Sequence, residues 1–191
     1  ATQSGSSAQE KDDQVNPIHL QPSTEEEIRI KGLADEAYSN GDLNATLKHL
    51  QAAYEVSKNP RYIANQGLVL ADSGRYAEAI KALEYFINTK PPLPKLRSAR
   101  AEIKRLRPEV YLITTPPGAL VTLTESKQSL GQSPITTHLV AGEHLITISK
   151  PGFDTQQIPL MIFPGKPVSI QYALIRRGRS LDEREQARFE G

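Results

Sequence analysis

Two histidines, His138 and His144, flank an Ala141-Gly142 pair. Imidazole is a common metal ligand, so two histidines close together could form part of a metal site. Ala141-Gly142 fits a two-residue hairpin turn, which would pair residue 138 with residue 145. Because side chains alternate between the two faces of a strand, the two imidazoles would then point to opposite faces. We therefore expect no metal site, and the absence of cysteine rules out thiolate ligands as well.

Three acids, Asp72, Glu78 and Glu84, are candidates for general acid and base chemistry. Their helical spacing and polar surroundings instead predict a solvated helix face. The sequence contains no glycine-rich phosphate loop, no paired-glycine dinucleotide turn, no nucleophile elbow and no two-histidine zinc helix. We expect a protein that is not an enzyme and holds no cofactor.

A strongly basic stretch covers residues 93–107, with six basic side chains and one acid, although the whole chain has a net charge of only +1. Apolar residues recur at helical spacing from Leu96 to Leu106, which predicts a helix with one apolar face. The opposite face carries Lys95, Arg97, Arg100, Lys104 and Arg105. This basic helix has three interpretations: a solvated face, a docking surface for an acidic protein, or a contact with phosphate. Nucleic acid would require a broader basic field.

Five helices are predicted ahead of residue 108. The first begins at Ser23, whose hydroxyl can cap it ahead of three consecutive glutamates, and it ends at Gly41. The next three cover residues 42–59, 62–73 and 76–89, and the basic helix is the fifth. Two joints, Asn40-Gly41-Asp42-Leu43 and Ser73-Gly74-Arg75-Tyr76, lie about 33 residues apart, so the helices repeat in pairs.

The second pair, through its run Gly74-Arg75-Tyr76-Ala77-Glu78-Ala79-Ile80, resembles the tetratricopeptide repeat. The first pair matches less closely, with Thr46 in place of the usual alanine, and a divergent helical hairpin is the alternative there. The resemblance implies that the first helix of each pair lines a concave groove for a partner segment, with the basic helix as the cap. The groove residues would be Lys31, Asp35, Tyr38, Arg61, Asn65 and Leu68, with Lys95 or Arg97 completing the set.

Some tetratricopeptide proteins grip a partner's C-terminal carboxylate with lysine and asparagine side chains. Lys31, Asn65 and Lys95 match such a carboxylate clamp. Asp35 does not, because it places a negative charge where these clamps have asparagine.

From Val110 onward the apolar period changes from 3.6 to 2, which predicts strands near residues 110–115, 119–124, 135–140, 144–149, 155–162 and 167–174. Turn signals follow in the order Thr115-Pro116-Pro117-Gly118-Ala119, Gly131 with Ser133-Pro134, Ala141-Gly142, Lys150-Pro151-Gly152-Phe153 and Pro164-Gly165. This order resembles the PEGA domain over roughly residues 108–175, although Pro117 stands where the family name expects glutamate. The resemblance implies a small antiparallel β-sandwich of bacterial envelope and surface proteins.

The two ends of the chain are polar. Residues 1–22 are rich in Ser, Gln, Ala and Asp, and we expect a disordered arm; residues 176–191 carry many charges of both signs and form a charged tail. No apolar run reaches the 18 residues that span a bilayer. Since the sequence begins at Ala1 rather than Met, a signal peptide or anchor can precede it.

The predicted fold class is therefore α+β: tetratricopeptide-like repeats with a capping helix over residues 23–107, then a PEGA-like sandwich over residues 108–175. The predicted function is a non-catalytic scaffold for protein–protein interaction in a bacterial envelope assembly, periplasmic or membrane-anchored, that holds other envelope proteins or a peptide segment in its groove. Two alternatives stay open: an adaptor that binds cell-wall or surface glycan through the sandwich, and a carboxylate-clamp co-chaperone.

Overall fold

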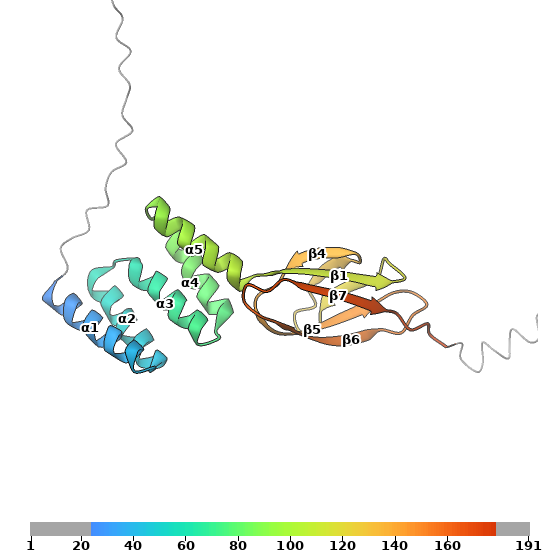
Figure 1. The fold of residues 1–191 in the computed structure, drawn as a ribbon, viewed down its shortest axis with the longest axis horizontal. Coiled ribbons are helices and arrows are strands. Elements are labelled where there is room, and N and C mark those ends of the chain that lie inside the picture. Colours follow the sequence, from blue (N-terminus) through green and yellow to red (C-terminus); the bar gives the residue numbers. More distant parts are fainter. Residues whose placement is uncertain (1–23, 179–191) are drawn as a thin grey trace, which may run out of the picture.

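The computed structural model describes residues 24–178. Five helices are followed by seven strands within these residues, which is the predicted α+β layout. Figure 1 shows the helices at one end of an elongated body and the strands at the other, so the first and last described residues lie far apart. The predicted arm over residues 1–22 and all but the first three residues of the predicted tail lie outside the described residues.

The five predicted helices are confirmed, with ends that shift by a few residues. They are α1 (Glu25–Ser39), α2 (Leu43–Ser57), α3 (Arg61–Asp72), α4 (Tyr76–Asn88) and α5 (Leu93–Leu106). The predicted cap, Ser23, lies outside the described residues; the first described residue, Thr24, caps α1, and its hydroxyl accepts the backbone N–H of Glu27 at 3.1 Å. Thr24 has the right spacing because the amide that it caps belongs to the third residue after it.

The two predicted joints have the same geometry. Gly41 and Gly74 both have φ of 76°, the left-handed conformation that closes a helix with glycine. At the first joint the amide of Asp42 donates to the carbonyl of Ala37 at 2.9 Å, and at the second Arg75 donates to Leu70 at the same distance. The repeat read from the sequence is thus a repeat of structure.

Small residues let the paired helices approach each other. Gly67 of α3 faces α4 so closely that an added Cβ would lie 2.9 Å from Leu83 Cγ and 3.2 Å from the carbonyl oxygen of Ala79. Thr46, which weakens the resemblance of the first pair, is fully buried. Its hydroxyl donates to the Asp42 carbonyl at 2.7 Å, so the helix backbone itself satisfies the polar group.

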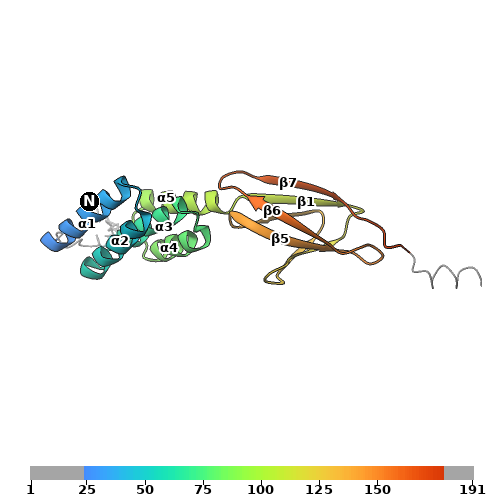
Figure 2. The same cartoon turned by 90° about the horizontal axis from the view of Figure 1, so that it is seen from below.

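The strands form two sheets packed face to face. One sheet has the order β4 (Ile135–His138), β1 (Glu109–Thr115), β7 (Val168–Ala173), and the other has the order β3 (Ser129–Gln132), β2 (Leu120–Leu123), β5 (Gly142–Ser149), β6 (Gln156–Ile162). The β1–β7 pairing is parallel and the other pairings are antiparallel. Figure 2 shows β1 and β7 in one layer, with β5 and β6 in the other. Val121, Ile146 and Ile148 are fully buried between the sheets.

Strand β3 was not predicted, because Gly131 was interpreted as part of a turn. Gly131 instead pairs with Val121 inside the sheet. Its φ of 128° favours glycine, and an added Cβ would lie 2.8 Å from Ile135 Cδ1. A glycine can therefore mark a crowded point in a strand as well as a turn.

The predicted hairpin at Ala141-Gly142 is wrong. β4 pairs with β1, whereas β5 pairs with β2 and β6, so residues 139–141 carry the chain from one sheet to the other. The Val140 side chain packs against the helical core. His138 and His144 accordingly belong to different sheets, and residues 24–178 contain no group of three His, Asp or Glu side chains arranged for a metal.

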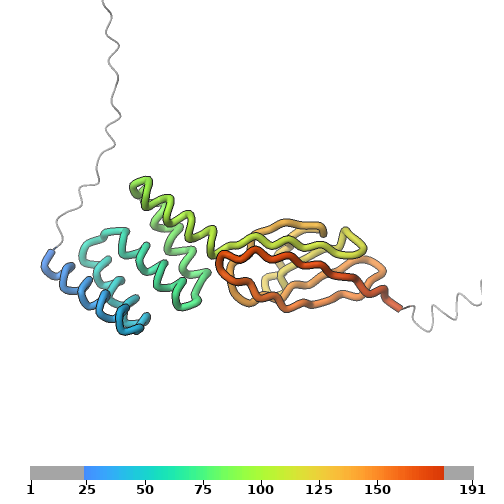
Figure 3. The backbone as a smooth tube through the Cα atoms, in the orientation of Figure 1, coloured from blue at the N-terminus to red at the C-terminus, as the bar shows by residue number. Residues whose placement is uncertain are grey.

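The helical and β parts are joined directly, as Figure 3 shows where the chain passes from α5 into β1. The last carbonyls of a helix have no partner within the helix. At the end of α5, backbone amides of the sandwich supply the partners of two such carbonyls. The amide of Ala141 donates to the Leu106 carbonyl at 2.8 Å, and that of Gly165 donates to the Arg105 carbonyl at 2.6 Å. Leu106 itself is fully buried. These contacts fix the sandwich to the carboxyl end of α5.

Candidate functional site

A hollow of about 250 Å³ lies between α1 and α3, with α2 behind it. Four of the six predicted groove residues line it, namely Asp35, Tyr38, Asn65 and Leu68. Five further residues complete the lining: Ala34, Thr46, Leu50, Val69 and Asp72. We call this hollow, defined by these nine residues, the α1–α3 groove. It occupies the place that the tetratricopeptide resemblance predicts for a partner segment.

The groove presents apolar surface on a fixed base. Ala34, Leu50 and Val69 are buried and form its floor. Above them, Tyr38 and Leu68 remain 49 % and 46 % exposed, although both are large apolar side chains. Exposed apolar groups next to a hollow are typical of interaction sites, because covering them releases water from apolar surface.

One hydrogen bond joins the two helices across the groove. Tyr38 of α1 donates from its hydroxyl to Asp72 Oδ2 of α3 at 2.8 Å. This bond raises the pKa of Tyr38 above its ordinary value, and the negative charge of Asp72 adds to the effect. The exposed phenol ring is therefore held in place at one end by a carboxylate of the next repeat.

Lys31, also predicted as a groove residue, lies outside the lining. Its ammonium group forms a close ion pair with Asp35, four residues further along α1. The Lys31 and Asp35 side chains are 48 % and 63 % exposed. Ion pairs this exposed on a helix surface contribute little to stability.

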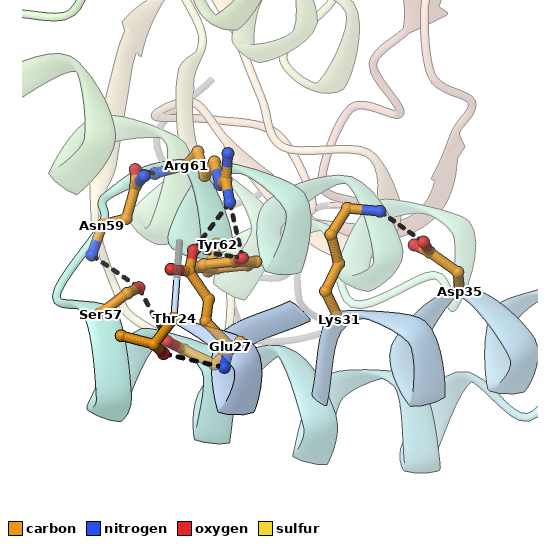
Figure 4. A network of polar contacts seen from close by, with 9 residues as sticks. Thr24, Glu27, Lys31, Asp35, Ser57, Asn59, Arg61 and Tyr62 are labelled. Atoms are coloured by element: carbon orange, nitrogen blue, oxygen red, sulfur yellow. Dashed lines mark hydrogen bonds and ion pairs between the residues drawn. The ribbon is translucent and has the colours of Figure 1, made fainter. Parts of the chain in front are cut away.

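Arg61, the sixth predicted groove residue, is engaged elsewhere. Its Nη2 donates to Glu27 Oε1 at 2.7 Å and to the Tyr62 hydroxyl at 2.8 Å, while the Tyr62 hydroxyl donates to the same Glu27 oxygen at 2.7 Å (Figure 4). Glu27 and Tyr62 are buried. Burial raises the pKa of Tyr62, and its bond to Glu27 acts in the same direction. Arg61 thus connects the start of α1 to the start of α3 and stabilises the stack of repeats.

Asp72 is the groove residue that the sequence analysis interpreted differently, as part of a solvated face. At the 33-residue spacing of the two joints, Asp72 lies one position beyond the equivalent of Tyr38, so the two side chains come from neighbouring positions on adjacent first helices. This spacing, combined with the repeat, was the signal that could have identified it. The floor residues Ala34, Leu50 and Val69 carried only the ordinary signal of a helix core.

The basic helix α5 divides into two sets of side chains. Lys95, Arg97, Arg100 and Lys104 are exposed, and none of the four forms an ion pair with another described residue. Arg105 differs, because its Nε and Nη2 donate to the Glu102 carboxylate at 2.8 and 2.6 Å. That bond is the main reason for its raised pKa, and the charge of Asp72 adds to it. Arg105 is therefore already engaged by a carboxylate of its own helix.

A second hollow of about 450 Å³ lies on the sandwich. Strands β5 and β6 form most of it, together with Glu125 from the segment after β2. Its lining combines acids with apolar side chains, among them Glu143, His144, Pro159 and Met161. Met161 is 46 % exposed. The His144 ring is held by the Val140 carbonyl, 2.6 Å from its Nε2.

Comparison with known proteins supports the interpretation of the C-terminal part. Residues 107–177 match the PEGA domain family. The match agrees with the ordered chain beyond β7, where the Arg177 amide donates to the Gly152 carbonyl at 3.1 Å. It covers the sandwich and does not extend to the helical repeats.

A 60-residue stretch of the chain is 37 % identical to a protein of Haemophilus influenzae described as "UPF0162 protein". The aligned stretch is 31 % of this chain and 22 % of that relative, so the chain spans about a fifth of the relative's length. Within residues 24–178, no helix has the length and apolar character needed to cross a bilayer.

Proposed function

We propose that this protein is a non-catalytic scaffold of a bacterial cell envelope assembly that holds a segment of a partner protein in the α1–α3 groove. The observation that carries the proposal is the exposed pair Tyr38 and Leu68 over a preformed apolar floor. Preformed hollows with apolar walls and a few placed polar groups are the usual form of a binding site.

The envelope setting draws on the sandwich. PEGA domains are modules of bacterial envelope and surface proteins, and residues 107–177 match that family. In this proposal the sandwich is a spacer or a second docking surface. Because the sandwich caps α5 through Ala141 and Gly165, it presents the groove in a fixed direction.

The carboxylate-clamp alternative receives less support from the groove. A clamp needs cations in the groove, but Lys31 and Lys95 both lie outside the lining. The charged side chains that do line the groove, Asp35 and Asp72, are acids and would repel a terminal carboxylate.

The glycan alternative would use the second hollow, where Glu125 and Glu143 can accept hydrogen bonds from sugar hydroxyls. The two functions predict different effects of substitutions. A glycan adaptor sediments with purified cell wall whether or not Leu68 is changed, whereas Glu143→Ala reduces the sedimented fraction. A groove scaffold does not sediment with purified cell wall, so Glu143→Ala has no sedimented fraction to reduce.

Affinity purification from envelope extracts of the native bacterium tests the groove. We expect the wild-type chain to retain one or a few proteins that Leu68→Glu loses. Glu55→Gln, which changes an exposed acid of α2 outside the groove, should retain them as the matched control. Equal recovery by Leu68→Glu and the wild type would contradict the proposal.

A further inference from the structure

We infer that the α1–α3 groove recognises a partner segment in which an arginine lies next to an apolar side chain. This inference rests on the proposed function and specifies the chemistry of the partner. It follows from three properties of the groove: the sign of its charges, the position of one tyrosine ring, and the apolar surface beside that ring.

The sign of the charges is the first property. Asp35 and Asp72 are the charged members of the nine lining residues, and both are carboxylates. The ion pair of Asp35 with Lys31 lies at the exposed surface of one helix, so an incoming cation can replace Lys31 at little cost. No lysine or arginine is among the nine lining residues. The groove thus offers acceptors to a positively charged partner.

The position of Tyr38 is the second property. Its hydroxyl donates to Asp72 Oδ2, while within residues 24–178 no hydrogen bond is made to the other oxygen of that carboxylate. A cation above the exposed ring would meet the ring face and the carboxylate together. The planar guanidinium of arginine can stack on the ring and bond to the carboxylate at the same time, which the ammonium of lysine does less well.

The apolar surface is the third property. Leu68 lies one turn before Asp72 on α3, and its side chain is 46 % exposed. Leu50 and Val69 close the floor behind it. A residue adjacent to the bound arginine would reach this surface, and burying a Leu- or Phe-sized side chain there is favourable. Apolar contact and charge are needed together, because exposed charge pairs alone bind weakly.

Peptide display on the whole chain tests the inference. A library of random ten-residue peptides, fused so that neither end is free, is selected on the wild-type protein with counter-selection on Leu68→Glu. The expected consensus contains an arginine within two residues of a large apolar residue. Binders that Leu68→Glu loses but that lack a basic residue would overturn this inference and leave the proposed function intact. If no binder depends on Leu68, the proposed function itself fails.

A synthetic consensus peptide then gives a quantitative test by fluorescence anisotropy. Asp72→Asn should weaken binding about tenfold, and replacing the peptide arginine by lysine should weaken it by a smaller factor. Glu55→Gln should leave the affinity unchanged. Equal affinity of the Asp72→Asn variant and the wild type would contradict the inference, provided that circular dichroism shows both to be folded.

Discussion

Tyr38 of α1 and Asp72 of α3 belong to the first helices of two successive helical pairs, and the Tyr38 hydroxyl donates to the Asp72 carboxylate at 2.8 Å. The bond spans 34 residues of sequence and crosses the mouth of the α1–α3 groove. It therefore links the repeat architecture directly to the candidate binding surface, since the same side chains define both.

This bond predicts a titration effect. The pKa of Tyr38 is raised, chiefly by the hydrogen bond to Asp72. A raised folded-state pKa means that the stabilisation is fully present below the ordinary tyrosine pKa and is lost as the pH rises through the folded value. NMR titration of ring-labelled tyrosine should show Tyr38 ionising at higher pH than free tyrosine, and Asp72→Asn should lower that pKa. An unchanged Tyr38 pKa in Asp72→Asn would show that the bond is absent in solution.

Glu27→Ala should destabilise the repeats by about 2 kcal/mol, because it leaves the buried Tyr62 hydroxyl without its acceptor and removes the partner of Arg61. Urea denaturation followed by circular dichroism measures the effect. The control is Glu55→Ala, an exposed acid of α2 whose loss should change the free energy of unfolding by less than about 0.5 kcal/mol. Similar effects of both changes would mean that the Glu27 network does not stabilise the stack.

Two glycine-to-alanine changes should have opposite signs. In Gly67→Ala the new methyl group meets Leu83 Cγ at 2.9 Å, so we expect a loss of about 1–3 kcal/mol. In Gly32→Ala nothing lies within 4 Å of the new atom, so the better helix propensity of alanine should stabilise α1 by up to about 1 kcal/mol. Melting temperatures of the two variants give the comparison, and a stabilised Gly67→Ala would contradict the close approach of α3 and α4.

Val140→Asp should uncouple the two parts of the molecule, because it places a charge where Val140 packs against the helical core. Rotational correlation times from ¹⁵N relaxation should be the same for both parts in the wild type and should differ in the variant. Thr136→Asp, at an exposed position of β4, is the matched control. Independent tumbling already in the wild type would mean that the capping of α5 by the sandwich is not maintained in solution.

The sequence predicted the helices well because strong local signals mark their ends. Glycines at Gly41 and Gly74, each at a position with positive φ, stop the first helix of each pair. The strands were predicted less completely. Gly131 is a residue type typical of turns, but it lies in β3. The connection at residues 139–141 depends on contacts with the helical core, which is distant in sequence. Local sequence carries no record of such contacts.

Part of the candidate site was predictable because the helical repeat indicates which residues face the groove. The repeat identified Asp35, Tyr38, Asn65 and Leu68 by their place on the first helices. It could not distinguish Arg61, which has a similar place but turns toward buried Glu27. Nor did it show that Lys31 would be held by Asp35. Which way a long charged side chain turns is decided by its neighbours in space.

Site-specific photo-crosslinking in intact cells of the native bacterium tests the central proposal most directly. A photoreactive amino acid is placed at Leu68 in the groove, at Met161 in the second hollow, and at Glu55 on α2 as the control. The groove proposal predicts a discrete crosslinked protein from position 68 that is missing from position 55. A discrete product from position 161 alone, or the same products from all three positions, would contradict it.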